Sequence, residues 1–176
     1  MKKNEKGITV VALMITIILL LILAGITIYT GKDSIQKANL EGLKTNMLLI
    51  QTKAREYVEN ASFDLGIDPQ NATDEMKTKA KNELSGEDKG TLVTSDDSIV
   101  DALLNIGIKQ EDIDNEKVFK LTTENLEKMG IHDVTSDSED GWYVIVYNID
   151  DTTAEIYHTI GYQGKHSLTE IEQIEL

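Results

Sequence analysis

The sequence predicts an α+β fold, in which a long N-terminal transmembrane and amphipathic helix carries a small antiparallel sheet on its C-terminal half. Three observations lead to this prediction: an uncharged apolar run over residues 7–31, a helical spacing of apolar residues over 43–61, and two strand-like segments, 142–147 and 155–160. The 176 residues are enough for one modest globular unit in addition to the helix. We therefore expect one head domain and not two.

The apolar run is long enough to cross a membrane. Residues 7–31 contain no charged side chain, and a helix rising about 1.5 Å per residue over that length spans a hydrocarbon core of about 30 Å. Lys2, Lys3 and Lys6 precede the run, and no comparable basic cluster follows it. By the positive-inside rule, the N-terminus stays cytoplasmic and the C-terminal part is exported. We expect a single-pass protein of the cell membrane, with residues 8–30 as its transmembrane helix.

Beyond this run, apolar residues recur at a spacing of 4-3-4-3-4, which places them along one face of a helix. The positions are Leu43, Met47, Ile50, Ala54, Tyr57 and Ala61. Such a stripe packs against a domain core more often than against a partner. We expect residues 31–62 to continue the helix outside the membrane, with this stripe under the sheet.

The remaining residues, 63–176, are expected to form a small α+β head. Segments 142–147 and 155–160 are rich in β-branched and aromatic residues and flank a turn-forming stretch at 148–153, a pattern that predicts an antiparallel hairpin. Because two strands alone are marginally stable in water, we expect further strands near 118–121 or in the tail. Short helices are expected within 68–98, over 98–106 and over 123–129.

The composition argues against several classes of protein. The chain has 31 acidic and 17 basic residues, a net charge of -14, and such a surface repels the phosphates of nucleic acids. It has no cysteine, so disulfides, thiolate zinc sites and cysteine nucleophiles are excluded. The sequence contains neither a glycine-rich phosphate loop nor a GxSxG elbow. We expect no catalytic residue, no cofactor and no enzymatic activity.

Two groups of residues raise the question of a metal site. The histidines lack the HxxxH or HxH spacing of zinc ligands, so the fold would have to bring them together; they are His132, His158 and His166. An acidic cluster precedes the hairpin and offers the oxygen ligands that calcium prefers, or is simply a solvated loop; it comprises Asp133, Asp137, Glu139 and Asp140. We assign no metal site, and we expect His158 to be an exposed residue of a strand.

The segment from Lys6 to Ile15, KGITVVALMI, resembles the class III leader of type IV pilin and type II secretion pseudopilin precursors. That leader is short and basic and ends in Gly. After this Gly come, in order, an apolar residue, a Thr, two more apolar residues, a residue that is usually Glu, and a long apolar helix. The segments KLTTENLEKMGI (120–131), WYVIVYN (142–148) and AEIYHTIGY (154–162) are also similar to the C-terminal part of Gram-positive pilin-like proteins. The resemblance implies a pilin-like fold and the role of structural subunit in a pilus or pseudopilus filament.

The resemblance also implies how the chain is processed. A prepilin peptidase would remove residues 1–7 by cutting after Gly7, leaving Ile8 as an N-terminus that is often N-methylated. Lys6 and Thr9 would belong to the recognised leader. Other pilin subunits, an assembly ATPase and a platform protein would be the further partners, and the mature subunit would pass from the membrane into a cell-surface filament.

The chain departs from the family pattern at two positions, Ile8 in place of the usual Phe and Ala12 in place of the usual Glu. That Glu is thought to pair with the N-terminus of a neighbouring subunit, and Ala12 cannot do so. A minor subunit at a filament tip and a Gram-positive variant family both fit this departure, and we favour the second. The alternative function is a signal-anchored extracytoplasmic binding protein that does not polymerise.

Overall fold

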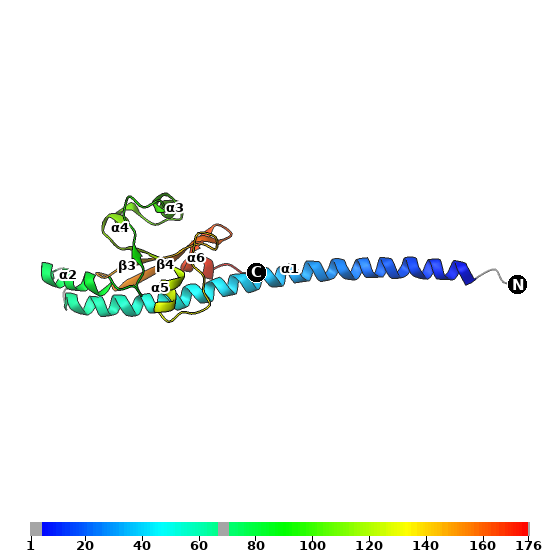
Figure 1. Cartoon of the computed structure of the whole chain (residues 1–176), viewed down its shortest axis with the longest axis horizontal. Coiled ribbons are helices and arrows are strands. Elements are labelled where there is room, and N and C mark those ends of the chain that lie inside the picture. Colours follow the sequence, from blue (N-terminus) through cyan, green and yellow to red (C-terminus); the bar gives the residue numbers. More distant parts are fainter. Residues whose placement is uncertain (1–4, 67–70, 176) are drawn as a thin grey trace. The chain divides into compact units, whose positions relative to one another are not determined.

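The computed structural model describes residues 5–66 and 71–175. The chain divides into two compact units, Met1–Glu41 and Gly42–Leu176. Helix α1, Glu5–Leu65, begins in the first unit and ends in the second (Figure 1). For part of this helix the structure describes the backbone alone: residues 5–12, 14 and 21–33.

Helix α1 corrects the predicted fold class. Within the part of the chain that the structure describes, no helix is both long enough and apolar enough to cross a membrane. The uncharged run ends at Gly31, and Lys32, Asp33 and Lys37 follow within the same 61-residue helix, so α1 as a whole is not apolar. The prediction of a transmembrane helix is therefore wrong. The prediction of an α+β chain with an antiparallel sheet is confirmed.

The C-terminal part of α1 buries the apolar stripe expected from the sequence. Met47, Ile50, Ala54 and Ala61 are fully buried, and Val58 joins them on the same face. The other two residues of the predicted stripe, Leu43 and Tyr57, are only half-buried. The buried residues follow one another at intervals of three and four, which keeps them on one side of a helix with 3.6 residues per turn. The stripe is therefore part of the core of the second unit.

The sheet has five antiparallel strands in the order β1-β2-β3-β4-β5. The predicted hairpin is confirmed, because β3 pairs with β4 in a register that runs from Tyr143↔His158 to Asn148↔Thr153. The expected additional strands are also present, both before the hairpin and in the tail. The strands are β1 (Thr91–Leu92), β2 (Val118–Leu121), β3 (Tyr143–Asn148), β4 (Thr153–Tyr162) and β5 (Lys165–Ser167).

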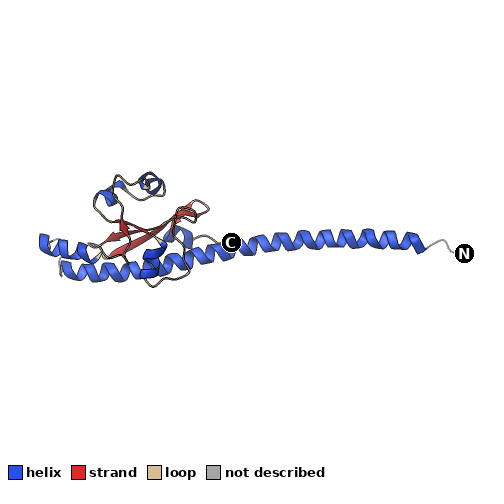
Figure 2. Ribbon diagram, viewed as in Figure 1, coloured by secondary structure: helices blue, strands red, loops and turns tan. Residues whose placement is uncertain are grey.

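Strand β3 is buried on both faces, so the centre of the sheet lies inside the second unit. Tyr143 and Ile145 point to the side of α1, where the Tyr143 hydroxyl accepts a hydrogen bond from the Asn46 side chain at 3.5 Å. Val144 and Val146 point to the other side, into an apolar cluster that includes residues of two short helices, α3 (Val100–Asn105) and α4 (Gln110–Asp114). Figure 2 shows the strands between α1 and these two helices.

Three further short helices complete the second unit. Helix α2 (Asp74–Glu83) lies beside the end of α1, where Lys79 forms an ion pair with Asp64 at 2.6 Å. Helices α5 (Thr123–Lys128) and α6 (Leu168–Glu172) each begin with a capping box. In each box the side chain of the N-cap residue accepts a hydrogen bond from the backbone N–H of the third helical residue, and the side chain of that third residue accepts one from the backbone N–H of the N-cap. Reciprocal caps of this kind fix the residue at which such a short helix begins.

Candidate assembly surfaces

The residues of the predicted leader lie at the start of the chain. Residues 1–4 are outside the described part, and α1 begins at Glu5. The residues that the sequence assigns to processing lie in the first turns of α1, where the structure describes backbone and not side chains: Lys6, Gly7, Ile8, Thr9 and Ala12. Cleavage after Gly7 and N-methylation of Ile8 therefore stay predictions.

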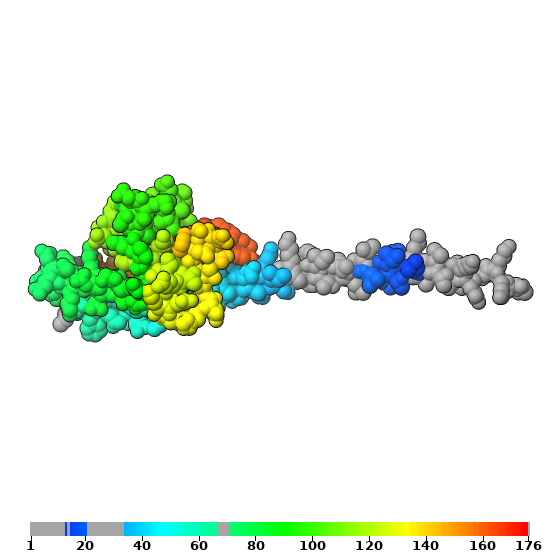
Figure 3. Space-filling view, in the orientation of Figure 1, coloured from blue at the N-terminus to red at the C-terminus, as the bar shows by residue number. Residues whose placement is uncertain are grey.

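The first candidate surface is the apolar part of α1 in the first unit. Its large side chains are each 48–64% exposed, and they are Leu13, Ile15, Ile17, Ile18, Leu19 and Leu20. Because successive residues of a helix are turned by about 100°, the four from 17 to 20 point to four different sides. Thr16 adds no free polar group, since its hydroxyl donates to the Leu13 carbonyl at 2.8 Å. The described atoms of this segment form the separate blue band in Figure 3.

The second candidate surface is the outward face of α1 in the second unit. Leu48 and Leu49 are about half exposed and Phe63 is 86% exposed. A polar stretch separates them, in which Lys53 and Glu56 form an exposed ion pair at 3.0 Å. Leu49 and Phe63 lie about 21 Å apart along the helix axis at 1.5 Å per residue. This face therefore carries two separate apolar points on a polar background.

A cavity of about 970 Å³ opens on the second unit between α2 and the turns that flank the sheet. Its floor is apolar and includes Leu65, Leu84 and Phe119. Three lysines and three carboxylates border it: Lys77 and Lys81 on α2, Lys117 before β2, and Glu116, Asp150 and Asp151 in the flanking turns. We call this the lysine-bordered cavity.

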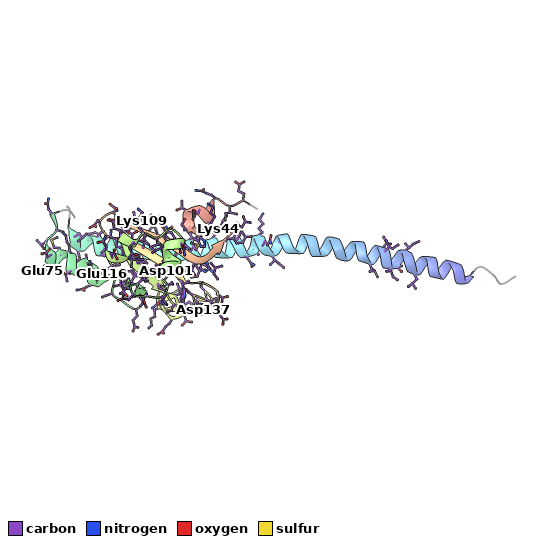
Figure 4. The ribbon with its side chains drawn as sticks, turned by 90° about the horizontal axis from the view of Figure 1, so that it is seen from above. Lys44, Glu75, Asp101, Lys109, Glu116 and Asp137 are labelled. Carbon is purple, nitrogen blue, oxygen red and sulfur yellow. The ribbon has the colours of Figure 1, made fainter. Side chains whose placement is uncertain are left out.

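Two of its lysines are held by polar neighbours. Lys81 reaches across from α2 to Glu116 (labelled in Figure 4), with an Nζ to Oε2 distance of 2.9 Å. Lys117 donates to the side chain of Asn148 at 3.2 Å. Sequence reasoning missed this cavity because its lysines come from segments about 40 residues apart and share no motif.

His158 is not the exposed strand residue that the sequence predicted, since it is only 6% exposed. Its ring lies 4.6 Å from that of Tyr143, and its Nδ1 accepts from the Gly161 N–H at 3.1 Å. Burial and then the charge of nearby His166 lower the pKa of His158 to about 4. The fold brings His166 close, with Nδ1 3.1 Å from the His158 carbonyl, whereas His132 is exposed in the loop after α5. His158 is thus a neutral residue of the core at pH 7.

The acidic loop is organised around Asp137, labelled in Figure 4. One oxygen of Asp137 accepts from the backbone N–H groups of Glu139 and Asp140, both at 2.8 Å. This is the turn chemistry for which aspartate is favoured. Among the described residues, no group of three or more potential metal ligands is found.

Comparisons with known proteins add no relative: no protein family, curated protein or solved structure matches the chain. The surfaces described above and the resemblance at the N-terminus are therefore the basis for a proposed function.

Proposed function

We propose that the chain is a structural subunit of a pilin-like filament, processed by a prepilin peptidase after Gly7 and assembled by packing of N-terminal helices. The observation that carries this proposal is the apolar part of α1, whose side chains at 13 and 15–20 are exposed on all sides. A helix that is apolar all round is stable only when it is surrounded by apolar neighbours. Neighbouring copies of the same helix supply such surroundings in a filament core.

Covering these side chains would contribute a sizeable part of the free energy of assembly. Complete burial of a leucine or isoleucine contributes about 1.5–3 kcal/mol, and six such side chains are about half exposed. Covering their remaining surface would contribute roughly 5–9 kcal/mol per subunit. Ala12 brings no carboxylate to this segment, so helix packing rests on apolar contacts in this proposal.

The second unit supports the same proposal in a different way. Its sheet covers one face of α1 through Met47, Ile50 and Ala54, and leaves the opposite face exposed. The head thus occupies only one side of its helix, and the other side remains available to neighbouring subunits. A structural role without catalysis fits this arrangement, and a location at the cell membrane and then in a surface filament stays a prediction.

The test is the intact mass and N-terminal sequence of the full-length protein, produced with an active prepilin peptidase and with an inactive one. Loss of residues 1–7 only with the active enzyme, leaving Ile8 with or without a methyl group, is the expected result. Gly7→Leu should leave the precursor unprocessed, while Lys6→Ala should still be cut. An unchanged Met1 terminus in every sample would overturn the proposal.

The second candidate function is a binding protein that does not polymerise. The lysine-bordered cavity favours it, because about 970 Å³ with an apolar floor and a few charged groups is the size and chemistry of a small-molecule site. Retention of residues 1–7 together with a monomeric protein would favour this function over the filament subunit.

A further inference from the structure

Helix α2 forms one wall of the lysine-bordered cavity. Its residues at the cavity are Lys77, Ala80, Lys81 and Leu84, and this spacing places them on a single face of the helix. The opposite wall comes from β2, β3 and the turns that flank them. A space of about 970 Å³ therefore lies between this face of α2 and those segments.

Few buried apolar side chains hold α2 in place. Within the helix, all of which the structure describes, only Ala80 is buried. Ala80 belongs to a small cluster with Leu65 and Ala72, against which Met76 and Ile149 pack. The open space beside the helix supplies no atoms for dispersion contacts. An element with so few buried contacts opens locally at a lower free energy than the core around it.

Two ion pairs attach α2 to the rest of the second unit. Lys79 pairs with Asp64 near the end of α1 at 2.6 Å. Lys81 pairs across the cavity with Glu116, in the turn before β2, at 2.9 Å, and these two side chains are 59% and 58% exposed. Exposed pairs of this kind are weak, so they hold the helix in a position from which it can be released.

Glu116 has a backbone conformation that is unusual for its residue type. Its φ is +60°, in the left-handed region that glycine adopts without steric cost. It lies in the turn that ends α4, where its N–H donates to the Ile113 carbonyl at 3.0 Å, a place in which glycine is common. The turn itself does not need a glutamate, and the contact of its side chain is with Lys81. Such conformations often mark functional positions.

The chain that follows α2 is fixed. Leu84 is only 4% exposed. The Tyr147 hydroxyl donates to the Lys89 carbonyl at 3.1 Å, and the Asn125 amide donates to the Glu87 carbonyl at 2.7 Å. The C-terminal end of α2 is therefore the end about which the helix can turn.

We infer that α2 is a hinged lid of the lysine-bordered cavity, which pivots at Leu84 and is latched by the ion pair between Lys81 and Glu116. Opening of the lid would widen access to the apolar floor. The inference does not rest on the proposed function, because it concerns a motion within the second unit that a filament subunit and a binding protein could both have.

The first test is hydrogen exchange of full-length Glu116→Gly. Amides of residues 74–83 should exchange about two- to fivefold faster than in the wild type, the range expected for loss of an exposed ion pair. The midpoint of chemical denaturation should not fall, because glycine relieves the left-handed conformation at this position. A lower midpoint with faster exchange throughout the second unit would overturn the inference, since it would show general destabilisation.

Asp133→Gly is the matched control. Asp133 is exposed, has a φ of +62°, and forms no ion pair within the described part of the chain. Its replacement removes the same charge from another turn and should leave exchange in α2 unchanged. Equal acceleration in the two variants, or none in Glu116→Gly, would show that Glu116 is not a latch.

A distance measurement separates movement of the lid from unfolding of α2 in place. Because the chain has no cysteine, Glu75→Cys and Glu111→Cys can carry two spin labels at exposed positions on α2 and α4. Glu75 lies about 14 Å from Leu84 along the helix axis, so a small rotation moves it far. Pulsed electron paramagnetic resonance should show a second, longer distance whose population grows in Glu116→Gly. Faster exchange without a longer distance would overturn the lid.

Discussion

Helix α1 presents two different surfaces along one continuous run of 61 residues. Between residues 13 and 20 the large apolar side chains that the structure describes are exposed on every side, whereas in the second unit they are divided between a buried face and an outward face. The second pattern is that of a helix which packs on its own domain. The first pattern leaves these side chains without a covering from the described part of the chain. If the chain is the filament subunit proposed above, folding and assembly depend on separate parts of α1.

The strongest way to break this comparison is to place a polar group in the first part. Ile18→Asn should abolish filaments, because an amide without a partner in an apolar helix bundle costs about 1–3 kcal/mol at every copy. The same change should alter the free energy of unfolding of the head by no more than about 0.5 kcal/mol. Electron microscopy and chemical denaturation of the full-length protein measure the two effects. A large loss of stability without loss of filaments would contradict the division of roles.

Two adjacent residues test the same division within the second unit. Ile50 is 0% exposed and Leu49 is about half exposed. Ile50→Ala should lower the free energy of unfolding by about 2–5 kcal/mol because it leaves a cavity in the core. Leu49→Ala, the matched control, should cost about 0.5 kcal/mol or less. Equal losses in the two variants would show that α1 does not pack through the face that the structure buries.

The buried face of α1 was predicted from sequence because its signal is local and periodic. The spacing that joins Met47, Ile50, Ala54 and Ala61 can be recognised without knowing what covers them. The hairpin of β3 and β4 was predicted for the same reason, since β-branched and aromatic runs flank a turn-forming stretch. Strand β1 carries no such signal, because two residues are too few to show a period.

Other features depend on contacts between distant segments. The exposure of His158 was predicted wrongly because His158 shares the buried face of β4 with Ala154 and Ile156, whereas Thr153 and Glu155 on the other face are exposed. Lys77 and Lys117 meet at one cavity only after folding. The membrane crossing was predicted from the length of the uncharged run over residues 7–31, and the charged residues from Lys32 onward, which were expected to continue the helix outside the membrane, lie in the same helix α1.

Burial of His158 makes the stability of the second unit depend on pH. Its pKa is lowered from 6.5 to about 4 in the folded protein, so the unfolded chain binds the proton more tightly. Stability from this residue is full above about pH 6.5 and is lost as the pH falls toward 4, by up to about 3 kcal/mol. After burial, the charge of His166 lowers the pKa of His158 further, and the carboxylate of Asp140 acts in the opposite direction.

Denaturation of the wild type at several pH values between 7 and 4.5 measures this slope. His158→Gln should remove most of it, whereas His132→Gln should leave it unchanged because His132 is exposed. A wild-type slope that persists in His158→Gln would assign the acid sensitivity to the carboxylates and not to the buried ring.

The smallest effect is expected on the outward face of α1 in the second unit. Lys53 and Glu56 are about half exposed and lie one turn apart, where an ion pair stabilises a helix by about 0.2–0.5 kcal/mol. Lys53→Ala should therefore lower the free energy of unfolding by less than 0.5 kcal/mol in dilute buffer, and by nothing measurable at high salt. If filaments survive this change and fail with Phe63→Ala, the outward face acts through its apolar points. If both variants lose filaments, the charged background of that face takes part in assembly as well.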